Sequence, residues 1–384
     1  MKFELPDVTQ IPNLKGARVI VRASFDVPLE NGEVRNQFRL LRSLPTLLYL
    51  TRAGAKVVII SHIGRDPELS LRPVYEVLKE HVPLLWCDQL TGTKTHTMVE
   101  RLGEGEAVLL ENLRGDEREK QNDEAFAKEL SQYGGVFVND AFAVSHRAHA
   151  SIVGIPKFLP SYIGHTFKDE YENLEKAEKP ASPSLFILGG AKFETKRPLI
   201  AKYIKHYDTV FVGGAIANDF FKAQGHDVGR SLVSSEDAGV AELLQHPHVM
   251  LPVDVVVATA DGERRVCTLN DVHKNESILD AGPETSRLLE ERIGNVAFIL
   301  WNGPLGDYEH TFTDATRACA KAIGSSDAFS VIGGGDTIAA IESLGLNDKF
   351  SFLSTAGGAM LAFLEHSTLP GIEAILESRT RLHE

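Results

Sequence analysis

The chain has 384 residues, 43% hydrophobic and 24% charged, and this length suggests two domains. Its formal charge of −13 at pH 7 argues against general binding to nucleic acid. Residues 1–16 lack a signal-peptide pattern, and no apolar run approaches the ~20 residues of a membrane helix, so we expect a cytoplasmic protein without a membrane partner. The three cysteines are scattered, which indicates neither a disulfide framework nor a zinc site.

In the first half, short apolar runs alternate with segments whose apolar residues recur every three or four positions, as in amphipathic helices. The predicted strands are Arg18–Arg22, Lys56–Ile60, Leu84–Cys87, Ala107–Leu110 and Val136–Val138. Helices are predicted at Pro45–Ala53, Val74–Glu80 and Asp123–Gln132. Repeated strand–helix–strand order predicts an α/β fold in which helices cover both faces of a parallel sheet.

The second half shows the same alternation. Its predicted strands are Ser184–Leu188, Thr209–Val212, Val253–Val257, Val296–Trp301, Phe329–Ile332 and Phe350–Leu353, and Phe312–Ile323 is a predicted helix. About a dozen strands is too many for one open sheet, so we predict two doubly wound parallel-sheet domains.

A domain boundary is predicted near the middle of the chain. Ser161–Lys179 has the pattern of a charged helix, and Pro180–Ser184 forms a stiff polar joint after it. We therefore expect an N-terminal domain at residues 1–165 and a C-terminal domain at residues 166–366.

Basic side chains of the first half lie at the end of a predicted strand or just after it. They are Arg22, His62, Arg65, Arg114, His146, Arg147 and His149. Because the carboxyl ends of parallel strands converge on one crevice, these side chains should lie close together. Positive charge gathered there in an acidic chain indicates a small phosphorylated anion as the ligand.

Glycine-rich motifs follow strands of the second half. They are Gly189–Lys192, Gly213–Ala215, Gly333–Thr337 and Ala356–Ala359. Such loops let the backbone approach a ligand and point N–H groups at a phosphate. We expect Thr195 to cap a helix whose first turn contains Pro198, so that Lys192 and Lys196 face a bound anion. Asp336 suits either a helix cap or a magnesium ligand.

Nine segments, in order, resemble the phosphoglycerate kinase family, and the resemblance runs from Leu14 to the C-terminal tail. They are Ser61–Arg65, Leu110–Arg114, Val138–Phe142, His146–His149, Leu188–Lys192, Leu251–Asp254, Trp301–Gly306, Gly333–Thr337 and Ser354–Ala359. The resemblance implies two Rossmann-like lobes joined by a helical hinge, with residues 367–384 packed back on the first lobe. It also implies a monomer.

The family's reaction is the reversible, Mg²⁺-dependent transfer of the acyl phosphate of 1,3-bisphosphoglycerate to ADP, giving 3-phosphoglycerate and ATP. By resemblance, the N-terminal lobe binds the glycerate, the C-terminal lobe binds the nucleotide, and the lobes close for transfer. The implied glycerate contacts are Ser24, Asp26, Arg39, His62, Arg65, Arg114 and Arg147. By the same resemblance, Arg39 contacts the phosphoryl group while it is being transferred.

The resemblance also assigns nucleotide contacts. Lys192 and Lys196 contact phosphates and, with Arg39, are the catalytic residues. The remaining phosphate contacts are Gly190, Asn302, Gly334, Gly335 and Thr337. Asp336 holds Mg²⁺, Glu309 accepts from the ribose hydroxyls, and Gly213, Gly214 and Pro304 line the adenine slot.

The chain departs from the family in its first motif, which usually reads Arg-x-Asp-Phe-Asn-x-Pro. Here Ser24 replaces the Asp and Asp26 replaces the Asn. Gly115 and Ala356 are further departures, read as packing changes. Two alternatives stay open: a non-catalytic protein that binds nucleotide or glycerate, for which the Ser24/Asp26 change is the sequence argument, and a kinase for another acyl phosphate.

Overall fold

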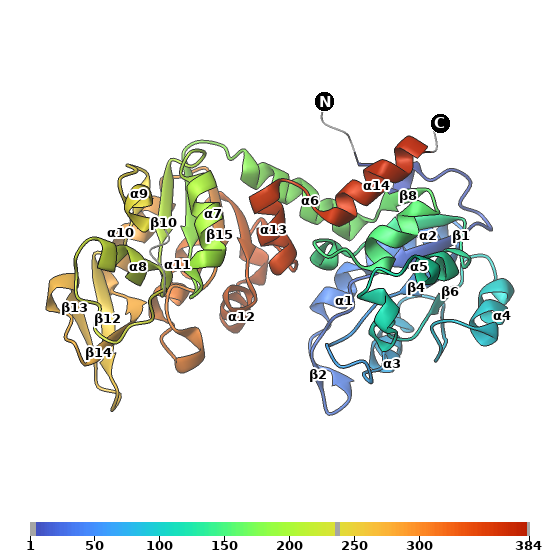
Figure 1. Ribbon diagram of the computed structural model, residues 1–384, viewed down its shortest axis with the longest axis horizontal. Coiled ribbons are helices and arrows are strands. Elements are labelled where there is room, and N and C mark those ends of the chain that lie inside the picture. The colour runs from blue at the N-terminus through green and yellow to red at the C-terminus, as the bar shows by residue number, and fades with distance from the viewer. Residues whose placement is uncertain (1–4, 235–238, 382–384) are drawn as a thin grey trace. The chain divides into compact units, whose positions relative to one another are not determined.

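The computed structural model describes residues 5–234 and 239–381, which form two compact units (Figure 1). The first unit comprises residues 1–172 and 366–384, and the second comprises residues 173–365. Residues 1–4 and 382–384, part of the first domain expected from the sequence, lie outside the described residues. Among the described helices, none combines the length and the apolar character needed to cross a bilayer.

A six-stranded parallel sheet forms the centre of the first unit, in the order β5-β6-β4-β1-β7-β8. The strands are β1 (Arg18–Arg22), β4 (Lys56–Ile60), β5 (Leu84–Trp86), β6 (Ala107–Leu109), β7 (Val136–Asn139) and β8 (Ser161–Ile163). The predicted α/β fold with parallel sheets is confirmed. Residues 161–163 are a strand rather than the predicted helix start, because they pair in register with β7.

Strand residues alternate between two apolar clusters because successive side chains point to opposite faces. Val19 and Val21 pack with Leu47 on one face, whereas Ile20 packs with Phe126 on the other. The helices of this unit are α1 (Phe38–Arg42), α2 (Leu44–Arg52), α3 (Arg72–Leu78), α4 (Thr93–Arg101), α5 (Glu124–Ser131), α6 (His165–Glu178, shared with the second unit) and α14 (Pro370–Arg381). A short hairpin, β2 (Leu29–Glu30) and β3 (Glu33–Val34), is also present.

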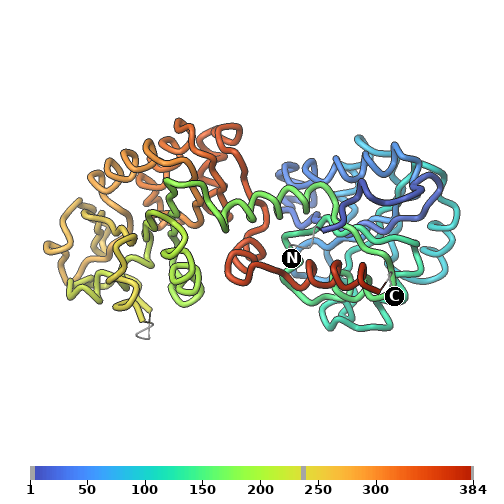
Figure 2. Tube along the Cα trace, turned by 90° about the horizontal axis from the view of Figure 1, so that it is seen from above, coloured from blue at the N-terminus to red at the C-terminus, as the bar shows by residue number. Residues whose placement is uncertain are grey.

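The C-terminal helix α14 packs on this first unit, as both views of the chain show (Figures 1 and 2). The Gly371 N–H donates to Ser145 O at 2.9 Å, and the Arg381 side chain donates to Pro156 O at 2.8 Å. The last helix of the sequence therefore completes a unit that the first residues begin.

The second unit has its own six-stranded parallel sheet, in the order β11-β10-β9-β15-β16-β17. Its strands are β9 (Ser184–Leu188), β10 (Thr209–Val212), β11 (Val249–Met250), β15 (Phe298–Asn302), β16 (Phe329–Gly333) and β17 (Phe352–Leu353). Its helices are α7 (Phe193–Tyr203), α8 (Ile216–Ala223), α9 (Val240–Leu244), α10 (Pro283–Ile293), α11 (Asp314–Gly324), α12 (Gly335–Ser343) and α13 (Gly358–His366). The strand order reverses beside β9, which creates the crevice where α/β proteins bind ligands.

The predicted strand Val253–Val257 does not join that parallel sheet. It becomes β12 (Asp254–Thr259), the centre of an antiparallel sheet with β13 (Arg264–Thr268) and β14 (Glu276–Ala281). The turn from β12 to β13 is too short for the crossover that parallel pairing requires, so the chain folds back as a hairpin.

The start of α7 also differs from the expectation. Lys192, not Thr195, occupies the N-cap position, and Pro198 lies inside the helix rather than in its first turn. The helix begins early because Phe193 is fully buried and packs edge-to-face on Phe220, with 5.8 Å between ring centroids. Thr195 instead donates its hydroxyl to Lys192 O.

The start of α6 depends on Asp140, which follows β7. Its Oδ1 accepts the N–H groups of Thr166 (2.9 Å) and Phe167 (3.2 Å). Gly164 precedes the helix, and any side chain there would collide with the Asp140 carboxylate. Burial raises the pKa of Asp140 to about 7, although these hydrogen bonds oppose the shift.

We expect Asp140→Ala to lower the free energy of unfolding by ~1–3 kcal/mol, because two buried N–H groups lose their acceptor. Asp140→Asn keeps an acceptor oxygen and should cost less. Since the folded-state pKa lies above the unfolded value, the folded state loses stability from this group as pH rises from about 4 to 7. Urea denaturation should therefore show that the free energy of unfolding of Asp140→Asn rises relative to that of the wild type between about pH 4 and 7. If the difference between the two free energies stays constant with pH, the raised pKa of Asp140 is wrong.

Candidate active site

Arg22, the last residue of β1, is the centre of a polar cluster in the first unit and is 1% exposed. Its Nη2 lies 2.9 Å from His62 Nδ1, and its Nε donates to Ser151 Oγ at 2.9 Å. Its Nη1 donates to Ala23 O at 2.5 Å. Because β1 lies between β4 and β7, Arg22 reaches the loops that follow both strands.

His62 presents a neutral N–H group to this site. A guanidinium group can only donate, so Nδ1 of His62 accepts and its proton lies on Nε2. Burial is the main cause that lowers the pKa of His62 to about 4; Asp26 opposes the shift, and the charges of Arg22 and Arg114 add to it. Nε2 is buried and lies 3.5 Å from Asp26 Oδ2, too far for a well-formed hydrogen bond, and it has no other partner among the described residues.

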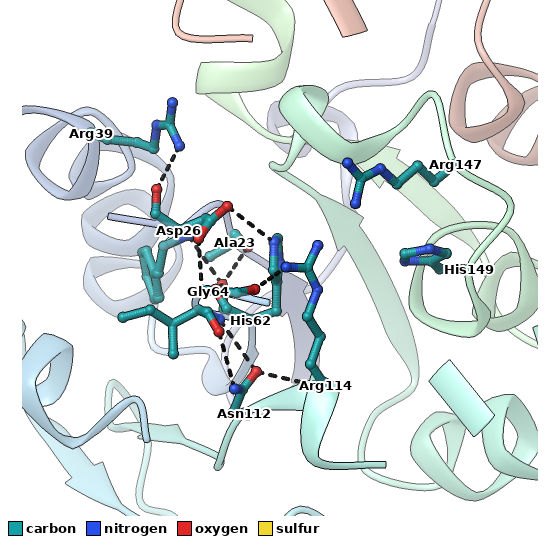
Figure 3. Close-up of polar contacts among 12 residues, drawn as sticks. Ala23, Asp26, Arg39, His62, Gly64, Asn112, Arg114, Arg147 and His149 are labelled. Carbon is teal, nitrogen blue, oxygen red and sulfur yellow. Dashed lines mark hydrogen bonds and ion pairs between the residues drawn. The ribbon is translucent and has the colours of Figure 1, made fainter. Parts of the chain in front are cut away.

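Asp26 faces His62 across the cluster, as Figure 3 shows. Its Oδ1 accepts the Gly64 N–H at 2.8 Å, and its backbone carbonyl accepts from Arg39 Nη1 at 2.5 Å. Burial raises the pKa of Asp26, but the contact with His62, the hydrogen bond from Gly64 and nearby positive charge outweigh it and bring the pKa to about 2. The carboxylate is therefore ionised at neutral pH.

Arg114 lies beside this pair and is 8% exposed. Its Nη1 donates to Gly64 O. Burial lowers its pKa, Asp26 opposes this, and the charges of Arg147 and Arg65 add to it, so all three arginines act on one region. Figure 3 shows Arg147 extending toward this region from the loop after β7. Arg65 and Arg147 are exposed.

The structure thus groups Asp26, Arg39, His62, Arg65, Arg114 and Arg147. Ser24 follows β1, is buried, and its Oγ has no hydrogen-bond partner among the described residues. Sequence reasoning missed Asn112, whose side chain bonds the backbones of Ile63, Leu69 and Arg114 and so fixes two loops. Its signal was present in the segment Leu110–Arg114.

The second unit contains a cavity of about 380 Å³ beside the carboxyl ends of β9, β10 and β15. This volume lies in the range of small-molecule sites. Five predicted residues line it: Gly190, Gly214, Pro304, Glu309 and Asp336. Its largely apolar wall, which the sequence did not reveal, includes Phe221, Leu232, Val255, Ile278 and Tyr308, with the buried carboxyl of Asp280.

Three loops meet at the cavity through direct backbone contacts. The Gly190 N–H donates to Pro304 O at 2.9 Å, and Ile216 N–H donates to Gly190 O at 3.2 Å. Gly214 has φ +61°, and a Cβ there would lie 2.7 Å from Gly190 N, so only glycine allows this approach. Gly213 adjoins this contact but is absent from the cavity lining.

Lysines and helix starts supply positive charge near these loops. Lys196 is 9% exposed, and its Nζ donates to Asn302 Oδ1 at 2.5 Å. Lys192 is exposed at the N-cap of α7. Burial lowers the pKa of Lys196 to about 8. Cationic side chains beside helix N-termini form a site that favours anions.

The motif Gly333–Thr337 forms the beginning of α12. Gly334 is the N-cap, and Gly335 and Asp336 lie in the exposed first turn. Thr337 is fully buried, and its Oγ1 accepts the Gly303 N–H at 3.1 Å, so its hydroxyl oxygen ties α12 to the loop after β15. Among the described residues, no three His, Cys, Asp or Glu side chains are grouped to hold a metal ion.

The family model of phosphoglycerate kinase matches residues 8–367. The chain belongs to the phosphoglycerate kinase family. A phosphoglycerate kinase from Roseiflexus castenholzii is 40% identical over 380 residues, which cover 94% of this chain and 96% of that protein. One from Xanthobacter flavus is 39% identical, covering 94% and 97%.

Solved structures agree with this membership. The phosphoglycerate kinase of Coxiella burnetii matches with a TM-score of 0.85 and 36% identity, covering 97% of this chain and 99% of that one. That of Pyrococcus horikoshii OT3 gives a TM-score of 0.85 at 31% identity, covering 98% and 100%. The predicted family is confirmed, whereas the roles of individual site residues stay predictions.

The pKa of Lys196 gives a pH test of the second unit. Its ammonium is charged below pH 8 and loses its proton as pH rises through about 8. We expect affinity for ATP, used as a polyphosphate probe, to fall by about tenfold between pH 7 and 9. Calorimetric titration measures this. Lys196→Arg keeps its charge and should flatten the profile; an equally steep profile in that variant would remove Lys196 as the cause.

Proposed function

We propose that this chain catalyses reversible, Mg²⁺-dependent transfer of the acyl phosphate of 1,3-bisphosphoglycerate to ADP, giving 3-phosphoglycerate and ATP. The observation that supports it best is the convergence of Arg65, Arg114 and Arg147 on one region of a phosphoglycerate kinase family member. A ligand with a carboxylate and a phosphate needs several cations at once, and Arg pairs with both groups through two parallel hydrogen bonds.

On the glycerate side, the three arginines bind the anionic groups, and the Nε2–H of His62 donates to a substrate oxygen. Arg39 neutralises charge on the phosphoryl group during transfer. Ser24 and Asp26 contact the glycerate, the first as a neutral hydroxyl and the second as a carboxylate that must face an anion.

On the nucleotide side, the cavity receives the base and ribose. Gly213, Gly214 and Pro304 contact the adenine, and Glu309 accepts from the ribose hydroxyls. Lys192 and Lys196 bind phosphate oxygens, and the remaining phosphate contacts are Gly190, Asn302, Gly334, Gly335 and Thr337.

Asp336 fits Mg²⁺ bound with the nucleotide. Mg²⁺ keeps several waters and takes one or two protein carboxylates together with phosphate oxygens. Asp336 is exposed, lines the cavity, and lies at a helix start where phosphates also bind. When bound there, Mg²⁺ would neutralise phosphate charge.

The transfer needs neither a protein nucleophile nor a strong base, because a substrate carboxylate attacks in the reverse direction. Charge in the loose transition state spreads over the equatorial oxygens, so the protein must align the substrates and neutralise charge. Arg39 and Lys192 do this, helped by backbone N–H groups at the start of α12. We further propose that the units close for transfer and that the enzyme is a cytoplasmic monomer.

One assay separates this proposal from its rivals. ATP-dependent turnover is measured with 3-phosphoglycerate, with glycerate and with acetate, with Mg²⁺ present and then chelated. We expect turnover of 3-phosphoglycerate alone, lost on chelation. Turnover of acetate would indicate another acyl-phosphate kinase. Binding without turnover would indicate a non-catalytic protein, for which the Ser24/Asp26 change is the one sequence argument.

We expect Arg39→Ala to lower kcat at least ~10²-fold, the usual loss when a preorganised charge donor is removed. A coupled assay measures it. Arg35→Ala is the matched control, because Arg35 lies nearby in the sequence, is exposed, and its side chain forms an ion pair with Glu30 at 3.4 Å. Near-normal kcat in Arg39→Ala would exclude its role in transfer.

We expect Ser24→Asp combined with Asp26→Asn to lower KM for 3-phosphoglycerate by roughly three- to tenfold. The change restores the family's pair, and an asparagine side chain at position 26 can donate a hydrogen bond, whereas the ionised Asp26 cannot. An imperfect polar pair costs ~1 kcal/mol. KM for ATP is the internal control. An unchanged or higher KM for 3-phosphoglycerate would reject this account of the departure.

A further inference from the structure

A chain of buried polar contacts runs from His62 into the interior of the first unit. Arg22 donates to His62 Nδ1 and, through Nε, to Ser151 Oγ, each at 2.9 Å. Ser151 Oγ donates to Glu119 Oε1 at 2.6 Å, and Ser151 N–H donates to Glu119 Oε2 at 2.9 Å. Arg22 and Glu119 are each 1% exposed, and Ser151 is fully buried.

The four residues come from four separate parts of the sheet's carboxyl edge. Arg22 ends β1 and His62 follows β4. Glu119 lies in the loop after β6 that also carries Arg114, and Ser151 lies in the loop after β7 that also carries Arg147. The chain of contacts therefore connects every loop that supplies one of the three arginines to the proposed glycerate site.

Charge compensation explains why Glu119 is present. A buried guanidinium is costly unless it is paired, and burial lowers the pKa of Arg22 to about 10 although Glu119 opposes this. Burial likewise raises the pKa of Glu119, while Arg22 and the hydrogen bonds from Ser151 oppose it. His149 Nδ1 lies 3.7 Å from Glu119 Oε1, but burial and neighbouring arginines lower the pKa of His149 to about 4, so it is neutral at pH 7.

The direction of each hydrogen bond follows from what the two groups that form it can donate or accept. The Ser151 backbone N–H donates to one oxygen of Glu119, and the Ser151 hydroxyl donates its proton to the other oxygen. The Ser151 oxygen is then free to accept from Arg22 Nε, and Arg22, which can only donate, turns Nδ1 of His62 into an acceptor. The remaining proton of the imidazole is left on Nε2, on the side of Asp26.

We propose that Glu119, Ser151 and Arg22 are positioning residues that hold His62 in its neutral Nε2–H tautomer, so that His62 donates to the glycerate instead of carrying charge. This inference rests on the proposed function for the identity of the ligand, but the tautomer is a property of the free protein. A fixed donor suits this place, because Arg22, Arg114 and Asp26 already face His62 and set the local charge.

The first test is the histidine tautomer in the full-length, ¹⁵N-labelled protein, observed by two-bond ¹H–¹⁵N spectra between pH 5.5 and 8. A His62→Gln spectrum identifies the His62 signals. We expect His62 protonated at Nε2 only, with no titration over this range. A proton on Nδ1, or a titration midpoint above pH 5.5, would overturn the proposal. This test needs no substitution of Arg22, Ser151 or Glu119.

The second test is Ser151→Ala, which removes the bridging hydroxyl with little change in volume. We expect the His62 signals to lose their single tautomer and KM for 3-phosphoglycerate to rise roughly tenfold, as for a lost hydrogen bond to a charged group, with KM for ATP unchanged. Ser131→Ala is the matched control: Ser131 is also buried in this unit, but its hydroxyl donates to Lys128 O, away from the cluster.

Arg22→Met provides a third test, which can be used if Ser151→Ala fails to fold. Without the donor at Nδ1, and with Asp26 still facing Nε2, His62 should titrate above pH 5.5. Unchanged His62 signals in a folded Ser151→Ala or Arg22→Met protein would overturn the proposal. If 3-phosphoglycerate is not turned over while the tautomer behaves as expected, the proposed function fails and the positioning role stands.

Discussion

A buried guanidinium imposes the main constraint on the first unit. Arg22 cannot leave its charge unpaired in the interior, so each of its three nitrogens must have an acceptor. Those acceptors come from the loops after β4 and β7 and from the residue that follows its own strand. The order of the parallel sheet, with β1 between β4 and β7, is what brings these loops within reach. A single desolvated charge thus fixes the position of the groups that are proposed to bind the ligand.

The candidate anion site of the second unit is built mainly from backbone atoms. Its loops after β9, β10 and β15 meet through backbone atoms, which requires glycine at Gly214 and leaves N–H groups and helix starts near the cavity. Burial of Lys196 against Asn302 keeps an ammonium in a dry setting, where it attracts an anion more strongly than in water. In the second unit, backbone geometry shapes the site and Lys196 adds charge, whereas in the first unit charged side chains form most of the site.

Charge is distributed unevenly in this acidic chain. The net charge is −13, yet Arg65, Arg114 and Arg147 converge on one region, and His62 and His149 are neutral at pH 7. Arginines therefore supply the positive charge there. Asp26 partly offsets it where the family usually has a neutral Asn, and its carboxylate also holds the Gly64 N–H that orients the loop carrying Arg65. The replacement of the usual Asn by Asp26 therefore orders the Gly64 loop, but it also places a negative charge beside the proposed anion site.

The sequence determined the parallel strands and the family, because apolar periodicity is local and the motifs keep their order along the chain. It located the cations at strand ends, since parallel strands share one edge. It did not give the hairpin of β12 and β13, the strand β8 or the early start of α7, which depend on turn length, pairing with β7 and burial of Phe193. Nor did it give the role of Arg22, whose partner Ser151 lies 129 residues away. Only tertiary structure decides which buried polar groups meet, because that choice follows from desolvation among distant segments.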